Sequence, residues 1–332
     1  MLKISKLLVC ILLIMGFAVG LPCAASFAQD LMKVRVGMVT VASQMALDIG
    51  LKKGFFAKHG FDVDIRPLTT GVQANQALAA NQVDWSAGGV ESTIIAASNN
   101  LPFKPYGIYA KGGDSLGILV RKDSGIKSLR DLQGKRIAVA SGTASAQGLS
   151  QVLKSLNLPN DSVRRVNANF ANMGQMLVQG AVDAMVGLEP FLTVTQQAIG
   201  ADGILLARLG QYVQGGGFFL ISDAWAAAHP DKLDAAVEAL WEAEKFVRDN
   251  PKEAAEINAK SLKADPAMIE TSSRWLKFDP QLDDFTIASL KQTSTYLMSE
   301  KIIVQEIDVD GFLKSARRAE ADVKKKRPEL LQ

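Results

Sequence analysis

Cysteine is almost missing from this sequence of 332 residues. Its two cysteines, Cys10 and Cys23, both lie near the N-terminus. If that segment is removed on export, the remaining chain has no thiol and can form no disulfide. A chain of about 300 residues is long enough to bury a core that stabilises the fold without cross-links.

Neither sign of charge dominates the chain. Its 37 lysines and arginines are balanced by 34 aspartates and glutamates, and removing Lys3 and Lys6 with the N-terminal segment lowers the net charge from +3 to about +1. This balance predicts no nucleic-acid partner and no attraction to a lipid surface. The basic run at residues 324–327 closes a helical pattern, so we interpret it as a solvated helix end.

Long hydrophobic runs are missing except at the N-terminus. The apolar run at residues 7–21 follows two lysines and precedes small residues, which is the pattern of a secretory signal peptide. It is shorter than the about 20 residues that a membrane anchor needs. We therefore predict a cleaved signal peptide over residues 1–28 and export of the remaining chain. Pro22 argues against the alternative of lipid attachment at Cys23.

Motifs for cofactor and metal chemistry are also missing. The sequence contains no Walker A string and no Gly-x-Gly-x-x-Gly. Its only histidines, His59 and His229, have no histidine or cysteine at metal-ligand spacing and stand beside a helix-ending glycine or a proline. We interpret both as terminal residues, and we predict no catalytic residue, metal ion or cofactor.

What the chain does contain is an alternation of strand and helix patterns. An apolar strand pattern at residues 33–41 precedes a helical pattern at 43–60, and such pairs recur. After residues 215–222 the pattern becomes almost wholly helical. Alternation of this kind predicts mainly parallel sheets with helices on both faces.

One short segment occurs twice. Residues 77–91 read ALAANQVDWSAGGVE and residues 176–190 read MLVQGAVDAMVGLEP. In both, a leucine stands five residues before a Val-Asp pair and a glycine stands four residues after the aspartate. The Val-Asp pair alone is ordinary turn chemistry. Two copies of a helix, a turn and a buried strand indicate two similar α/β lobes, whose glycine turns should meet at one ligand crevice.

Four strings along the chain resemble those of a known family. They are GLKKGFFAKHGFDVDI at 50–65, ALAANQVDW at 77–85, SGIKSLRDLQGKRIAVASGTAS at 124–145 and AVDAMVGLEPF at 181–191. In this order they resemble the periplasmic substrate-binding proteins of ABC importers of the sulfonate, taurine and nitrate type. The resemblance extends over roughly residues 33–320.

The resemblance implies an α/β clamshell of two lobes, the type II periplasmic-binding-protein fold, with a mainly parallel sheet flanked by helices in each lobe and a helical C-terminal region. Lobe 1 would comprise residues 29–117 and 219–332, and lobe 2 residues 118–218. We expect the chain to cross between lobes near 114–120 and 215–219, where glycines supply permissive backbone.

The resemblance also implies a function. A monomer would capture a small solute, expected to be an anion such as a sulfonate, nitrate or carboxylate, and deliver it to an ABC permease in the inner membrane. Two alternatives stay open: an enzyme of the thiamine-pyrimidine-synthase type on the same fold, and a ligand-loaded adaptor for a membrane sensor. The cysteine-rich signature of those synthases is missing from this sequence.

Candidate ligand-binding residues follow the strands. The stretch SGTASAQG at 141–148 opens a helix, whose free amides and hydroxyls could seat an anion, although Thr143 could equally serve as a helix cap. Glu189 would repel an anion, so it either points away or receives a ligand amine. We interpret Trp85 as a core residue. The candidate residues are Ser43, Gln44, Ser86, Gly88, Gly89, Glu91, Ser92, Thr93, Ser141, Gly142, Thr143, Ala144, Ser145 and Glu189.

The signal peptide gives the first testable prediction. We expect the exported protein to begin at Gln29, or within a few residues of it, because a row of small residues ends at Ala28. N-terminal sequencing and intact mass measure this directly. A retained leader, or a mass that includes acyl chains on Cys23, would contradict it.

Overall fold

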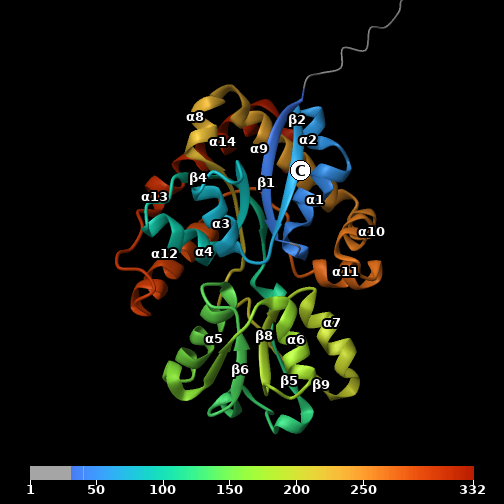
Figure 1. Ribbon diagram of the computed structural model, residues 1–332, viewed down its shortest axis with the longest axis vertical. Helices are drawn as coiled ribbons and strands as arrows, with labels where there is room; N and C mark the ends of the chain where they lie inside the picture. Colours follow the sequence, from blue (N-terminus) through green and yellow to red (C-terminus); the bar gives the residue numbers. More distant parts are fainter. Residues whose placement is uncertain (1–30, 40) are drawn as a thin grey trace, which may run out of the picture. The chain divides into compact units, whose positions relative to one another are not determined.

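Two five-stranded sheets organise the described residues, which are 31–39 and 41–332 of this computed structural model (Figure 1). The predicted signal peptide, residues 1–28, and the predicted start at Gln29 lie outside the described residues. Helices pack against both sheets, which confirms the predicted α/β class.

The first sheet has the strand order β2-β1-β3-β10-β4. β1 pairs in parallel with β2 and β3, whereas β10 runs antiparallel to β3 and β4. Four of its five strands therefore share one direction, as predicted. The strands are β1 (Met32–Val39), β2 (Phe61–Leu68), β3 (Trp85–Gly89), β4 (Phe103–Lys111) and β10 (Gly216–Ser222).

The second sheet repeats this arrangement with the order β7-β6-β8-β5-β9. β6 pairs in parallel with β7 and β8, and β5 is antiparallel to β8 and β9. The fourth strand in each order is thus the reversed one. The strands are β5 (Leu116–Arg121), β6 (Arg136–Val139), β7 (Arg164–Asn167), β8 (Ala184–Leu188) and β9 (Gly203–Arg208).

Helices cover the sheets according to their place in the chain. The second sheet packs with α5 (Ala144–Ser155), α6 (Phe170–Val178) and α7 (Phe191–Ile199). The first packs with α1 (Met45–Lys52), α2 (Phe55–Lys58), α3 (Gly71–Ala79), α4 (Val90–Ser98) and α8 (Asp223–Ala228). The helical C-terminal region comprises α9 (Leu233–Asp249), α10 (Pro251–Leu262), α11 (Pro266–Ser273), α12 (Asp284–Ser299), α13 (Val309–Phe312) and α14 (Lys314–Lys326).

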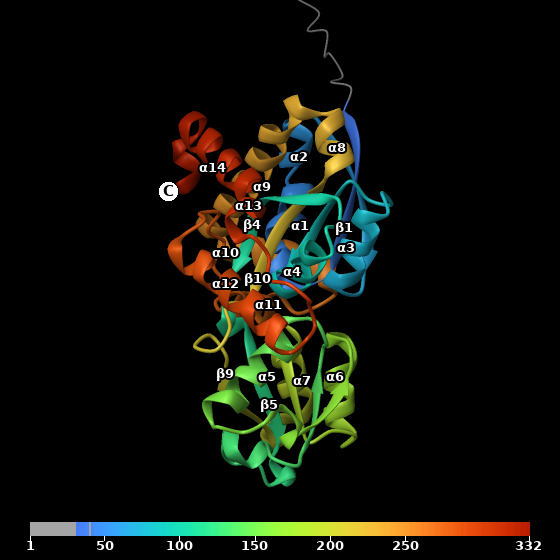
Figure 2. The same ribbon diagram turned by 90° about the vertical axis from the view of Figure 1, so that its left-hand side faces the viewer.

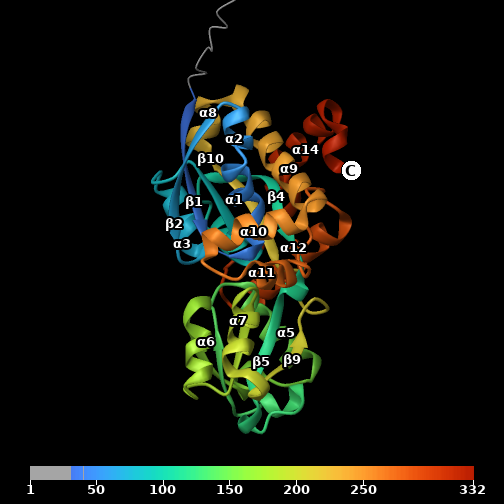
Figure 3. The same ribbon diagram turned by 90° about the vertical axis from the view of Figure 1, so that its right-hand side faces the viewer.

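The C-terminal helices return to the first sheet and its helices. Figure 2 shows α14 near β4 and α12 near α4, and Figure 3 shows α9 and α10 beside α1, in agreement with the contacts between these elements. The basic residues 324–326 form the last turn of α14. The helical C-terminal region and the helix-end interpretation of the basic run are therefore confirmed.

The chain passes between the sheets twice, at residues 112–115 and 209–215. The predicted lobe boundaries, at 117/118 and 218/219, fall inside β5 and β10 instead. Both strands are continuous apolar runs. The sequence pattern therefore does not indicate which residue is the first to pair with a neighbouring strand. Gly112, Gly113 and Gly215 lie in the crossing segments, shortly before β5 and β10.

The two crossing segments pack directly on each other. The Gly112 N–H donates to the Gln214 carbonyl at 3.2 Å. A Cβ on Gly113 would lie 1.7 Å from the Val213 carbonyl oxygen, so no side chain fits between the segments. This close approach explains the glycines at this position.

Trp85 lies at the centre of an aromatic cluster in the first sheet and its helices. Its ring centroid is 4.9 Å from that of Phe61, 5.4 Å from that of Phe219 and 5.1 Å from that of Trp225. The indole is fully buried. The interpretation of Trp85 as a core residue is confirmed.

The repeated segment builds the same local structure in both sheets. α3 and α6 begin and end 99 residues apart, and so do β3 and β8. Asn81 and Gly180 occupy matching positions in the connections, and both have left-handed backbone, with φ of 54° and 71°. Glycine and asparagine adopt this conformation at the lowest steric cost.

The aspartate of each Val-Asp pair clamps its strand to the neighbouring one. Asp84 accepts hydrogen bonds from the Arg35 backbone N–H at 2.9 Å and from its guanidinium at 2.7 and 3.0 Å. Asp183 accepts from the Arg136 backbone at 2.8 Å and its guanidinium at 2.8 and 3.2 Å. The Arg136 side chain holds the pKa of Asp183 below its ordinary value. The repeat therefore fixes β3 to β1 and β8 to β6.

We expect Asp84→Ala to lower the free energy of unfolding by about 1–3 kcal/mol, because the partly buried Arg35 amide loses its acceptor. Asp183→Ala should act in the same direction. Asp62→Ala, at an exposed position of β2, is the control and should change stability by less than about 0.5 kcal/mol. Urea unfolding measures all three, and equal losses for Asp84→Ala and the control would refute the clamp.

Candidate functional site

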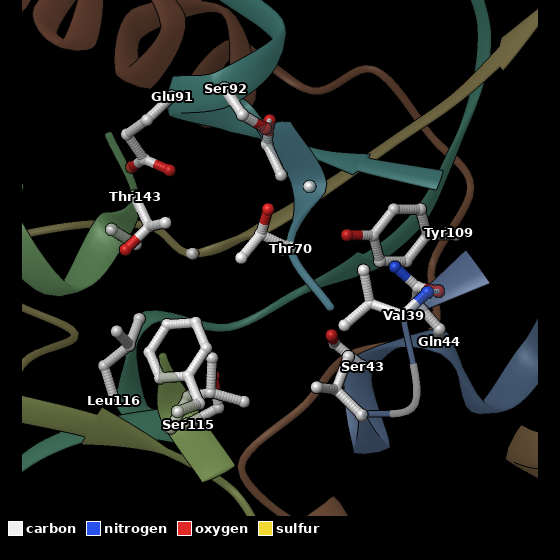
Figure 4. A pocket seen from close by; sticks show the side chains of 18 of the residues that line it. Val39, Ser43, Gln44, Thr70, Glu91, Ser92, Tyr109, Ser115, Leu116 and Thr143 are labelled. Carbon is white, nitrogen blue, oxygen red and sulfur yellow. Dashed lines mark hydrogen bonds between the residues drawn. The ribbon is translucent and has the colours of Figure 1, made fainter. Parts of the chain in front are cut away.

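A cavity of about 90 Å³ lies where strand ends from both sheets converge (Figure 4). Its walls come from the ends of β1, β2 and β3 in the first sheet, from those of β6, β7 and β8 in the second, and from the crossing segments. Ligands of open α/β sheets bind at this side of the strands. The cavity is therefore the candidate binding site.

Half of the predicted site residues line the cavity. These are Ser43, Gln44, Gly89, Glu91, Ser92, Thr143 and Ala144. The others, Ser86, Gly88, Thr93, Ser141, Gly142, Ser145 and Glu189, are not among its lining residues. Contact with a ligand remains a prediction for the first group.

The residues outside the lining have other environments. Ser86 and Thr93 are fully buried and do not line the cavity. Ser145 is also buried, and its hydroxyl donates to the Val186 carbonyl at 2.5 Å, which ties the start of α5 to β8. Ser141 is exposed, and its N–H donates to Asn167 Oδ1 at 3.1 Å.

The candidate residues Ser92 and Thr93 lie inside α4 and not before it. The helix begins at Val90, directly after β3, with Gly89 as its N-cap. The Ser92 hydroxyl donates back to the Gly89 carbonyl at 3.0 Å rather than capping the helix. The strand passes into the helix without a loop, so the hydroxyls lie within the first turn.

Several lining residues were missed by the sequence interpretation. Thr70 had a usable signal, because it follows a strand and caps α3, where it accepts from the Gln73 N–H at 3.2 Å. Tyr109 lies inside β4 and Phe170 opens α6, so neither carries a local sign of ligand contact. The remaining lining residues are Val39, Val41, Thr69, Gly71, Ser115, Leu116, Leu188, Gly215 and Gly216.

One wall of the cavity is held by the Gln44 amide. Its Oε1 accepts from the Val39 N–H at 2.8 Å, and its Nε2 donates to the Ala87 carbonyl at 3.2 Å. This joins the ends of β1 and β3. Tyr109 stands on the same side of the cavity (Figure 4), and burial raises its pKa against the effect of hydrogen bonds with Gln44 and Ser43. The phenol is therefore neutral.

Thr143 is both a helix cap and part of the cavity wall. Its Oγ1 accepts from the Ser145 N–H at 3.2 Å and donates to the Ala140 carbonyl at 2.7 Å. The capping alternative therefore holds. Since Thr143 also lines the cavity, the cap shapes the surface that a solute would meet.

Glu91 lies opposite the start of α5. Its side chain is on the Thr143 side of the cavity in Figure 4, and the residue is only 3% exposed. Burial raises the pKa of Glu91 to about 7, against the effect of hydrogen bonds from its own amide and from that of Ala144. The amides predicted to seat a ligand anion thus face a carboxyl group of the protein.

Glu189 points away from the cavity. Its Oε1 lies 2.7 Å from Arg208 Nη2, and its Oε2 accepts from the Thr193 hydroxyl at 2.8 Å. The carboxylate is fully buried in this pair. The geometry supports the first of the two alternatives for Glu189.

Arg208 connects this pair to the C-terminal region. Its guanidinium carbon lies 4.5 Å from the centre of the Trp275 ring, and its Nη1 donates to the Asp114 carbonyl in a crossing segment at 3.1 Å. Arg208 thus contacts the residue after β8, a crossing segment and the residues after α11. The Glu189–Arg208 pair is part of the support of the crossing region.

Ser115 stands in a Gly-x-Ser-x-Gly string, residues 113–117, which the sequence interpretation missed. This pattern marks the nucleophile of many hydrolases when it lies between a strand and a helix. Here it lies in a crossing segment, and the Ser115 hydroxyl donates to the Gly112 carbonyl at 2.7 Å. None of the described residues lining the cavity is a histidine. The string has neither the context nor the base of a nucleophile site.

The two histidines are terminal residues, as interpreted. His59 is the C-cap of α2, with its Nε2 3.3 Å from Glu242 Oε1, and His229 is the C-cap of α8. Within residues 31–39 and 41–332 no group of three or more histidines, cysteines, aspartates or glutamates could hold a metal ion. No helix in the same residues is long and apolar enough to span a membrane.

We expect Arg208→Met to lower the free energy of unfolding by about 3–5 kcal/mol at pH 8, because it leaves a buried carboxylate without its cation. The double variant Arg208→Met, Glu189→Gln should recover much of that loss, since the buried charge is gone. Urea unfolding of the two variants and the wild type measures this. No recovery in the double variant would assign the loss to the contact with Trp275 instead.

Comparison with known proteins supports the two-sheet architecture. The solved alkanesulfonate-binding protein of Xanthomonas axonopodis pv. citri, bound to MOPS, superimposes with a TM-score of 0.76 at 20% identity, over 86% of this chain and 98% of that one. This likeness shows a shared fold. It confirms the predicted two-lobe periplasmic-binding-protein architecture.

Curated relatives include binding proteins and an enzyme. A Bacillus subtilis (strain 168) protein named for binding aliphatic sulfonates is 25% identical over 296 residues, 87% of this chain and 89% of that protein. The taurine-binding periplasmic protein of Escherichia coli (strain K12) is 27% identical over 221 residues, 64% of this chain and 67% of that protein. The 4-amino-5-hydroxymethyl-2-methylpyrimidine phosphate synthase of Aspergillus parasiticus is 23% identical over 218 residues, 62% and 63% of the two chains.

A family model also matches this chain. The model described as "NMT1/THI5 like" matches residues 44–254, which is more than half of the sequence. The matched region includes both copies of the repeat, both crossing segments and most of the cavity wall. The chain belongs to the NMT1/THI5-like family.

Proposed function

We propose that the chain is the periplasmic solute-binding component of an ABC importer. It captures a small solute between two lobes and delivers it, as a monomer, to a permease in the inner membrane. The observation that carries this proposal is a cavity walled by strand ends of both sheets beside two paired crossing segments. The ligands named for the sulfonate-binding and taurine-binding relatives favour a solute with an acid group.

Contacts between the second sheet's helices and α12 fit a closing motion. Gln147 Nε2 donates to Thr293 Oγ1 at 3.1 Å, and the Ser150 and Tyr296 hydroxyls are 3.1 Å apart. Thr293 and Tyr296 are three residues apart and so lie on one face of α12. In our proposal these bonds form when the lobes close about residues 112–115 and 209–215 and a bound solute satisfies both walls.

Binding fits the cavity better than catalysis. Its described lining residues include no cysteine, histidine, lysine or arginine. The Ser115 hydroxyl donates to the Gly112 carbonyl, which cannot take its proton and so does not activate it. The synthase alternative would have to use Glu91, the one carboxyl group of this lining, as its base. The sensor-adaptor alternative uses the same cavity, and pull-down with the permease or with a receptor separates the two.

A ligand screen followed by one substitution tests the proposed function. We expect at least one small sulfonate, carboxylate or inorganic anion to raise the unfolding temperature, because a ligand that binds only the folded state stabilises it. Thr143→Ala should then weaken binding about tenfold, since the α5 amides lose the cap that orders the cavity wall. It should also lower unfolding stability by about 1 kcal/mol.

Asp265→Ala is the matched control. Asp265 is the N-cap of α11 and is not among the lining residues, so this variant should lose similar stability and keep its affinity. Calorimetric titration and urea unfolding give both quantities. Equal affinities of Thr143→Ala and Asp265→Ala would show that Thr143 is a cap alone, and a screen without any stabilising solute would overturn the proposed function.

A further inference from the structure

The Glu91 carboxyl is a buried group of the cavity wall with one oxygen left unpaired. It is 3% exposed, and its Oε1 has no hydrogen-bond partner among the described residues. Its position is fixed because Glu91 lies in the first turn of α4, directly after β3. A buried carboxylate normally has a cation or several hydrogen-bond donors around it. Glu91 has an acceptor oxygen to spare, and this oxygen belongs to a residue of the cavity wall.

No side chain of the wall supplies the missing cation. The described lining residues include no lysine, arginine or histidine, and their other ionisable group is Tyr109 on β4. The charges around the other buried glutamate of this region differ, because Glu189 is paired with Arg208 at 2.7 Å. The protein thus pairs one buried carboxylate with a cation and leaves the other, in the cavity wall, without one.

Other lining residues offer donors for an acid group. The Thr70 hydroxyl oxygen accepts from the Gln73 N–H, so its proton is free to donate, and Ser43 adds a second hydroxyl. In Figure 4 both side chains lie apart from that of Glu91, with Ser43 on the side of Tyr109 and Gln44. A solute with an acid group at these hydroxyls could place a second group at Glu91.

We propose that Glu91 is a specificity-determining residue that binds an ammonium group of the solute, so that the captured solute is a small zwitterion with an acid group at one end and a protonated amine at the other. This inference rests on the proposed function. An ammonium supplies the cation that Glu91 lacks and an N–H donor for its unpartnered Oε1, and the bond is charge-assisted. A simple anion would instead meet like charge at Glu91.

Proton linkage gives this proposal its own signature. Burial raises the pKa of Glu91 to about 7, so the free protein holds a partly protonated carboxyl near neutral pH. An ammonium binds the ionised form, so its affinity should rise about tenfold between pH 6 and pH 8, with proton release at the lower pH. A simple anion favours the protonated form, so its affinity should fall over the same range. Tyr109 stays neutral throughout and adds no charge.

The experiment titrates matched probes into the protein purified from the full-length gene. The probes are 2-aminoethanesulfonate against ethanesulfonate, and 3-aminopropanoate against propanoate, each at pH 6 and pH 8. We expect the amine-bearing member of a pair to bind at least tenfold more tightly at pH 8. Glu91→Gln should weaken its binding about tenfold to a hundredfold, remove the pH dependence, and leave the plain anion bound as well or better.

Two further variants complete the design. Glu91→Asp keeps the charge and should retain the preference for the amine at reduced affinity, and its unfolding curve shows whether the fold is intact. Glu256→Gln, at an exposed position of α10, makes the same chemical change away from the cavity and should bind as the wild type does.

The outcomes separate this inference from the proposed function. A plain anion that binds the wild type as tightly as its amine-bearing partner overturns the role of Glu91 and leaves solute capture in place. So does full affinity of Glu91→Gln for the amine-bearing probe. A wild type that binds neither member of either pair, yet is stabilised by another solute without an amine, overturns it too. A protein that no solute stabilises overturns both proposals.

Discussion

The carboxylate clamp between neighbouring parallel strands is the interaction on which the site depends. In each sheet one aspartate binds both the backbone amide and the guanidinium of an arginine on the adjacent strand. A shift of one residue in the strand register would turn every side chain to the other face of the sheet. The aspartate opposes such a shift because it binds both the backbone amide and the side chain of the same arginine. The strand ends, and with them the cavity wall, are placed by this register.

The repeated segment therefore serves to build the two sheets in the same way. Its two copies match residue for residue from α3 to β3 and from α6 to β8, including a left-handed residue at Asn81 and Gly180. The copies diverge only after the strand. The first continues through Gly89 directly into α4, which carries Glu91, whereas the second continues through Glu189 before α7. The two glutamates, which differ in their partners, therefore lie just after the matched strands β3 and β8.

The two buried glutamates, Glu91 and Glu189, differ in whether the protein supplies a cation for the carboxyl group. Both are almost fully buried near the crossing region. Glu189 is compensated by Arg208, which also contacts Trp275 and Asp114, and so it strengthens the joint between the sheets. Glu91 has no such partner and faces the cavity. Desolvation without compensation is costly for structure, and it is useful where a ligand supplies the missing charge.

The sequence by itself determined the alternation of strands and helices, the helical C-terminal region, the duplicated lobe and the capping position of Thr143. These features depend on local backbone preferences and on the period of apolar residues, both of which are readable along the chain. It also placed Ser43, Gln44, Glu91 and Ala144 near strand ends, where the cavity lies.

Only the tertiary structure decided which polar groups meet. Tyr109 lines the cavity although it lies inside a strand, whereas Ser86 and Thr93 are buried and do not line it. Glu189 pairs with Arg208, which lies on β9 at the edge of the second sheet. Pairings of this kind join residues from elements that are distant in sequence or separated by other strands. They depend on how sheets and helices pack, and no local pattern encodes the free energy of that packing.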